Sequence, residues 1–162
     1  MLLNPGELAS FYGNVPPLDV FRLRSFHLDW HGPMVTLRVD LSTFPSTLPS
    51  QWEGVDVDTV QCHLQFIAVS DFVLRDWAPS VAPVRMAIAA LGEQGRVTVS
   101  VAGDGVDLGF RSASSVRLGH VSAFKMGVDG TDEGPRIFTK RMDSLRYRSL
   151  PATDEKNFHG RI

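Results

Sequence analysis

The stretch FHLDWHGPMVTLRVDL, residues 26–41, decides the fold class of this 162-residue chain. Apolar and polar residues alternate on both sides of His31-Gly32-Pro33, which is the pattern of two half-buried strands joined by a tight turn. Upstream, Phe21 and Leu23 alternate in the opposite phase. A bulge near Arg24-Ser25 would bring both sets of side chains to one face. The sequence therefore predicts a β-hairpin with a bulge in its first strand.

The same alternation recurs downstream in shorter runs that begin at Thr59, Phe72, Val84, Arg96, Val106 and Val116. Residues 84–91 fit strand or helix spacing, and the turn-like residues 92–95 that follow favour a strand. Gly103-Asp104-Gly105 predicts another tight turn. Short strands without long crossover helices favour antiparallel pairing. We expect a mainly β fold (α+β at most), an antiparallel β-sandwich or open barrel of about eight strands.

A short N-terminal helix is expected to cover part of this sheet. Asn4 and Glu7 are spaced as an N-cap and the partner residue of a capping box, with Pro5 at the first helical position. Leu8 and Phe11 then fall on one face of the helix. Since two turns are marginal in isolation, this face should dock onto the sheet.

Length and a hydrophobic content of 43% indicate one domain with one core. Residues 1–129 hold 9 basic and 13 acidic side chains, whereas residues 130–162 hold 7 and 5. We expect a single β-rich domain over residues 1–128, followed by a polar, basic C-terminal tail over 129–162, flexible or partly helical.

The composition also bounds location and partners. No apolar run approaches the roughly 18–20 residues of a membrane span, and no basic segment leads a long apolar run at the N-terminus. The single cysteine, Cys62, excludes an intramolecular disulfide. A net charge of −2 does not indicate a nucleic-acid binder. We expect a soluble cytoplasmic protein that binds another protein.

No group of residues predicts catalysis, a metal or a cofactor. Cys62 and His63 are adjacent in a strand and so point to opposite faces, which rules out a dyad in a regular strand. His27 and His31 flank a turn, and His120 has no acidic neighbour in the sequence. Residues 129–134 have acidic side chains but lack the ligand spacing of a calcium loop.

Two places combine tryptophan with carboxylates, residues 52–58 and residues 76–77. Aromatic side chains beside acids suit a contact surface for a basic protein. In the alternative interpretation, both tryptophans cover the edge of the core while the carboxylates stay in water. The predicted partner-binding residues are Trp52, Glu53, Asp56, Asp58, Asp76 and Trp77.

A set of short motifs, in order along residues 1–128, resembles the immunity protein 50 family. They are Leu2-Leu3-Asn4-Pro5, Tyr12-Gly13 with Val15-Pro16, Gly32-Pro33 before Thr36-Leu37, Asp40-Leu41, Phe44-Pro45, Trp52, Thr59-Val60-Gln61, and Leu74 with Trp77. The resemblance implies a small, predominantly β, cytosolic protein of a bacterial polymorphic toxin system. Such a protein protects its producer from the toxin encoded beside it, and it needs no catalytic group.

The leading hypothesis is therefore an immunity protein that neutralises a cognate toxin by stoichiometric binding. The mild acidity of residues 1–129 would suit a basic toxin such as a nuclease. The alternative is a β domain with a ligand cavity or an unrecognised enzymatic activity, in which His27, His63 or His120 would converge with carboxylates. A third hypothesis is an assembly module that oligomerises through a strand edge or an apolar patch.

Overall fold

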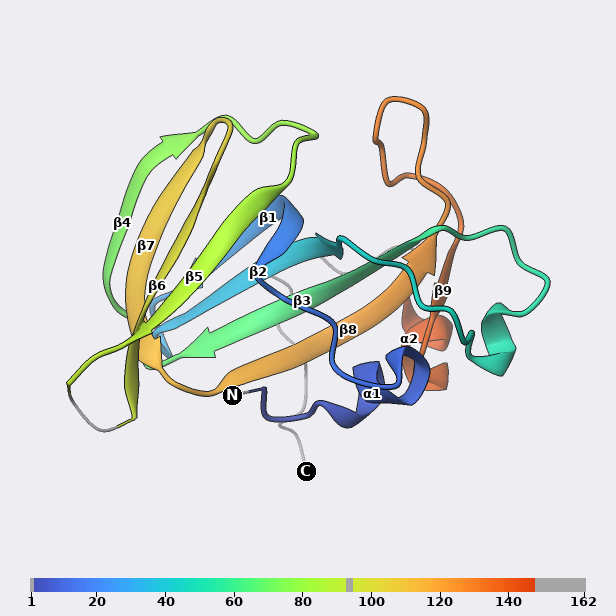
Figure 1. Ribbon diagram of the computed structural model, residues 1–162, viewed down its shortest axis with the longest axis horizontal. Coiled ribbons are helices and arrows are strands. Elements are labelled where there is room, and N and C mark those ends of the chain that lie inside the picture. The colour runs from blue at the N-terminus through green and yellow to red at the C-terminus, as the bar shows by residue number, and fades with distance from the viewer. Residues whose placement is uncertain (1, 93–94, 148–162) are drawn as a thin grey trace.

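The computed structural model describes residues 2–92 and 95–147. This part of the chain forms nine strands, two short α-helices and one 3₁₀ turn (Figure 1). The elements are α1 (Gly6–Tyr12), β1 (Val20–Asp29), β2 (Met34–Leu41), η1 (Ser50–Trp52), β3 (Thr59–Ile67), β4 (Ser70–Trp77), β5 (Val84–Ala90), β6 (Arg96–Gly103), β7 (Val106–Ala113), β8 (Val116–Phe124), β9 (Arg136–Phe138) and α2 (Arg141–Arg146).

All nine strands belong to one sheet in the order β4-β7-β6-β5-β1-β2-β3-β8-β9, and every neighbouring pair is antiparallel. The sheet curls, so that Phe66 of β3 meets Phe110 of β7 with ring centroids 5.1 Å apart. The expected mainly β, antiparallel class is confirmed. Because the strands form one continuous sheet, the architecture is an open curled sheet and not two separate layers.

The hairpin predicted from residues 26–41 is present, and so is its bulge. Phe21 pairs with Leu41 and Phe26 with Leu37, with a register shift between Leu23 and Ser25. The shift keeps Phe21 and Leu23 buried while Phe26 packs against the same core. A second prediction also holds, because residues 84–90 form strand β5 and not a helix.

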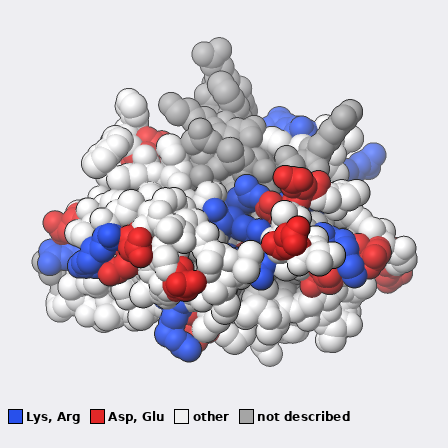
Figure 2. Space-filling view, turned by 90° about the horizontal axis from the view of Figure 1, so that it is seen from above, with Lys and Arg blue, Asp and Glu red and all other residues white. Residues whose placement is uncertain are grey.

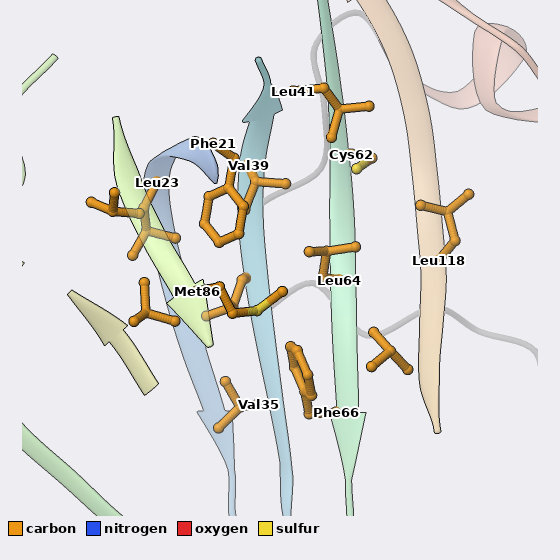
Figure 3. Packing of buried hydrophobic residues seen from close by; sticks show 14 of the residues in the cluster. Phe21, Leu23, Val35, Val39, Leu41, Cys62, Leu64, Phe66, Met86 and Leu118 are labelled. Carbon is orange, nitrogen blue, oxygen red and sulfur yellow. The ribbon is translucent and has the colours of Figure 1, made fainter. Parts of the chain in front are cut away.

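The core fills the concave face of the sheet (Figure 3). Alternate side chains of β2 and β3 point into it, and each large one contributes about 1.5–3 kcal/mol by leaving water. Cys62 is fully buried among them, as its place in the alternation predicted. The fully buried members on these two strands are Val35, Leu37, Val39, Val60, Cys62, Leu64 and Phe66.

Helix α1 docks onto the core through Leu8 and Phe11, as its apolar face predicted. The predicted capping box is wrong. Pro5 occupies the N-cap position and no side chain caps the helix. The Asn4 amide instead donates to the carbonyl of Leu118 (2.9 Å) and accepts from its N–H (2.8 Å), so that it fastens the N-terminal segment to β8.

Candidate functional site

Because the sheet curls, five connecting segments come to lie along one margin of the molecule. Hairpin turns at the opposite margin reverse the chain, so these five all lie where β1, β3, β5, β7 and β9 begin and where β2, β4, β6 and β8 end. Figure 1 shows all of them except residues 13–19, which cross the middle of the view, along the upper and right-hand side of the molecule. The segments are residues 13–19, 42–58, 78–83, 104–105 and 125–135. We call them together the acidic margin.

The acidic margin carries most of the charge found in the connecting segments. It contains one basic residue, Lys125, and eight acidic ones: Asp19, Glu53, Asp56, Asp58, Asp104, Asp129, Asp132 and Glu133. At the opposite margin, the turns that the structure describes in full (30–33, 68–69 and 114–115) contain no Lys, Arg, Asp or Glu. Figure 2 looks onto the molecule from above and shows acidic and basic side chains interspersed.

The predicted partner-binding residues before β3 divide into buried and exposed ones. Trp52 is 0% exposed and packs against Phe11, with ring centroids 5.3 Å apart. Its side chain therefore belongs to the core and offers no surface to a partner. Glu53 is exposed, and Lys125 pairs with both Asp56 (3.0 Å) and Asp58 (3.4 Å). Two of the predicted residues, Asp56 and Asp58, are thus brought together around one lysine.

The other predicted pair, Asp76 and Trp77, ends the edge strand β4. Both residues are exposed, Trp77 by 36%, and the indole lies edge-on to Phe26 with ring centroids 4.6 Å apart. They border segment 78–83 of the acidic margin, at the other end of the margin from residues 53–58 (Figure 1). The most exposed tryptophan, Trp30 at 79%, lies in the β1–β2 turn at the opposite margin.

A network of buried charges anchors segment 125–135 to the convex face of the sheet. The Asp132 carboxylate accepts hydrogen bonds from Arg38 of β2 and from Gln61 of β3 (3.0 Å), and it pairs with Arg136 of β9 (2.9 Å). Burial alone would raise the pKa of the Asp132 carboxyl. The Gln61 hydrogen bond and the charges of Arg38, Arg136 and Arg24 outweigh burial, so the pKa lies below its usual value.

Arg24 of β1 completes this network. Its guanidinium donates to the Gly130 carbonyl (2.6 Å) and to the Asp40 carboxylate (2.7 Å), and Asp40 also accepts from Gln61 (2.5 Å). Asp40 is 2% exposed, so its charge depends on these partners. Sequence reasoning missed the network because its members are separated by up to 106 residues and no local motif marks them.

The segments of the acidic margin also hold one another. Arg22 donates to the Val81 carbonyl (2.6 Å), and the Asp58 carboxylate accepts from the N–H of Met126 (2.9 Å). Between them lies a pocket of about 350 Å³ with mainly apolar walls. Its apolar lining residues are Val20, Phe21, Leu41, Phe44, Pro83 and Met126, and its polar ones are Arg22, Asp40, Ser42, Thr43, Asp58 and Thr59. The margin is therefore a packed surface, and its loops are not independent of one another.

A second cluster lies on the convex face of β3 and β8. Here His120 Nδ1 lies 2.9 Å from an Asp143 carboxylate oxygen, and the His120 ring contacts His63 (5.8 Å) and Tyr147 (5.3 Å). Asp143 comes from α2, so the acidic neighbour of His120 could not be found by sequence proximity. Cys62 lies in the core on the other face of β3, where burial raises the pKa of its thiol. His63 and Cys62 are therefore separated, as their adjacency in a strand predicted.

Two general properties follow from the described residues. Among residues 2–92 and 95–147, no group of three or more His, Cys, Asp and Glu side chains could hold a metal ion. None of the helices in these ranges has the length and apolar content needed to cross a membrane.

Comparison with known proteins gives one match. The family model described as immunity protein 50 matches residues 4–123, from the residue before the N-cap of α1 to the penultimate residue of β8. The matched range covers more than half of the chain and includes all strands except β9. Neither the curated proteins nor the solved structures contain a match.

Proposed function

Because the chain belongs to the immunity protein 50 family, we propose that it neutralises a cognate toxin of a polymorphic toxin system by stoichiometric binding. Immunity proteins of this kind are generally non-enzymatic, and the proposal requires no catalytic group, metal or cofactor. We further propose that the protein acts in the cytoplasm of the bacterium that produces the toxin. Family membership is the observation on which this proposal chiefly depends.

The charge of the acidic margin supports a basic partner surface. Seven of its eight acidic residues are exposed, and only Lys125 opposes them within the five segments. Complementary charge raises the rate of association and disfavours binding to partners of the wrong charge. A nuclease has a cationic cleft because it binds phosphates, so a nuclease is the class of toxin that this surface fits best.

The size and the order of the acidic margin also suit tight binding. A standard protein–protein interface buries about 800 Å² on each partner, which several loops of one sheet margin can provide. Loops that are already ordered lose less conformational entropy on binding. The hydrogen bonds of Arg22, Arg24 and Asp58 order three of these segments in the unbound protein.

The His120–Asp143 pair favours a second candidate, an enzymatic or ligand-binding activity. A carboxylate that holds an imidazole in place is a common part of a general base. If the pair were responsible for protection, His120→Ala would abolish protection while leaving the affinity for the toxin unchanged. If binding is responsible, the His120→Ala variant protects in proportion to its affinity.

Co-expression tests the proposal directly. The toxin domain encoded beside this gene would be induced in a host with or without this chain, and growth would be followed. We expect full growth only with the chain present, and a 1:1 complex of the two proteins on size-exclusion chromatography. A chain that neither restores growth nor forms the complex would contradict the proposed function.

A further inference from the structure

We propose that segment 125–135 is the part of the acidic margin that enters the active-site cleft of the toxin, with Val128 at its tip. This inference rests on the proposed function and adds the mode of inhibition, which is direct occlusion. The segment leaves the end of β8 and returns into β9. Figure 1 shows that it projects beyond the ends of the neighbouring strands.

The tip of this loop is apolar and wholly in water. Val128 is 105% exposed, the highest value of any large hydrophobic residue in the described part of the chain. Val81 of segment 78–83 is 55% exposed and lies against Gly130 of this loop. A Cβ added at Gly130 would lie 2.9 Å from the Val81 side chain. Val128 at the tip of the projecting loop and Val81 beside Gly130 at its base give this part of the margin exposed apolar surface.

Exposed acidic side chains lie on the same loop. Asp129 and Glu133 are exposed, and the part of the chain that the structure describes gives neither of them an ion pair. Asp132, by contrast, turns inward to Arg38 and Arg136. An apolar centre with a charged periphery is the usual arrangement of an interface. The complementary site is a cleft with cationic walls and an apolar floor.

The base of the loop is fixed. Within the loop, Gly127 N–H donates to the Thr131 carbonyl (3.0 Å) and Gly130 N–H donates to the Gly127 carbonyl (2.9 Å). Gly130 has φ +73°, a conformation that other residues adopt with strain. Below the loop, Arg24 holds the Gly130 carbonyl, and Arg136, whose side chain is 1% exposed, holds Asp132. A projection held in this way can enter a cleft without the entropic cost of ordering it.

The choice of a protein cleft, and not a nucleic acid, follows from charge. A loop that presents Asp129 and Glu133 repels phosphates. A cleft that binds phosphates for catalysis would attract the same loop. Occupation of that cleft would exclude the substrate, so inhibition should be competitive.

The test uses the full chain and an inactivated toxin domain from the neighbouring gene, with affinity measured by calorimetry. We expect Val128→Ser to weaken binding at least 10-fold and the double variant Asp129→Lys/Glu133→Lys at least 100-fold. The matched control is Asp71→Lys/Asp107→Lys, which makes the same charge change on strands β4 and β7, outside the acidic margin. We expect the control to change affinity less than 3-fold.

A second readout distinguishes the loop from a general charge effect. A photo-crosslinking residue at position 128 should attach to residues that line the toxin's active site, and the toxin's substrate should compete with this chain. If wild type binds the toxin while both loop variants bind equally well, or if position 128 crosslinks outside the cleft, the inference is wrong. If wild type does not bind at all, the proposed function itself fails.

Discussion

Removal of the Asp132 carboxylate is the perturbation that the structure defines best. In Asp132→Ala, Arg136 loses the carboxylate 2.9 Å away and keeps hydrogen bonds to Gln61 (3.0 Å) and to the main-chain carbonyl of residue 132 (2.5 Å). Arg38 loses its only ion pair among the described residues. The guanidinium of Arg136 thus stays buried with weaker compensation.

The burial of the three side chains sets the size of the effect. Leaving one partner of a fully buried ion pair unpaired costs about 3–5 kcal/mol. Here the Arg136 side chain is 1% exposed, but Asp132 is 19% and Arg38 22% exposed, and Gln61 still accepts from Arg136. We therefore expect a loss of about 2–3 kcal/mol in the free energy of unfolding, at or below the lower end of that range. For a chain of this size, the melting temperature should fall by about 4–12 °C.

Urea unfolding followed by circular dichroism measures this loss. The matched control is Asp129→Ala, three residues away on the same loop, exposed and without an ion pair in the described residues; we expect it to change stability by less than about 0.5 kcal/mol. The reasoning would be refuted if Asp132→Ala were as stable as wild type, or if both variants lost the same amount.

Three further predictions concern pH, packing and the thiol. The folded pKa of the Asp132 carboxyl lies below its ordinary value of 3.8, so the ionised carboxylate stabilises the fold fully above pH 3.8. This stabilisation is lost as the pH falls through the folded pKa. The free energy of unfolding of wild type should therefore fall more steeply with decreasing pH than that of Asp132→Asn. Gly119→Ala places a Cβ 2.8 Å from the His63 Cβ and should lower the free energy of unfolding by about 1–3 kcal/mol, as measured by thermal unfolding. Gly109→Ala leaves 3.6 Å between the new Cβ and the Val99 carbonyl oxygen and should cost under half of that. Cys62 should react with a thiol reagent at pH 8 only after the protein is unfolded, because it is fully buried with a raised pKa; fast reaction of the folded protein would contradict its placement.

Local patterns predicted the elements of the sheet well. Alternation around residues 26–41 was sufficient for the hairpin, and the phase change at Leu23 was sufficient for its bulge, because both follow from side-chain periodicity within one strand pair. Burial of Trp52 agrees with the alternative in which tryptophan covers the core edge. The strand order, with β4 at one edge and β5 beside β1, was not predictable from these patterns, because each strand alone fits several neighbours.

The sequence predicted acidic residues of the candidate site but not the residues that they contact. Glu53, Asp56 and Asp58 were recognised as an acidic loop, yet the proximity of Asp56 and Asp58 to Lys125 depends on the pairing of β3 with β8. Asn4 was misinterpreted because a helix cap and a long-range contact use the same amide, and the contact with Leu118 prevailed. Asp132 and Arg38 meet only in the folded structure, so the spacing of residues in the sequence does not predict their contact.

The central claim is that this chain binds a toxin through its acidic margin, and the salt dependence of binding tests it most directly. The measurement is calorimetric titration of the chain with the inactivated toxin domain from the neighbouring gene at 50 and 300 mM salt. We expect a 1:1 complex whose affinity falls at least 10-fold at the higher salt, because the contact is between opposite charges screened over about 10 Å. Absence of binding, or an affinity that salt leaves unchanged, would contradict it.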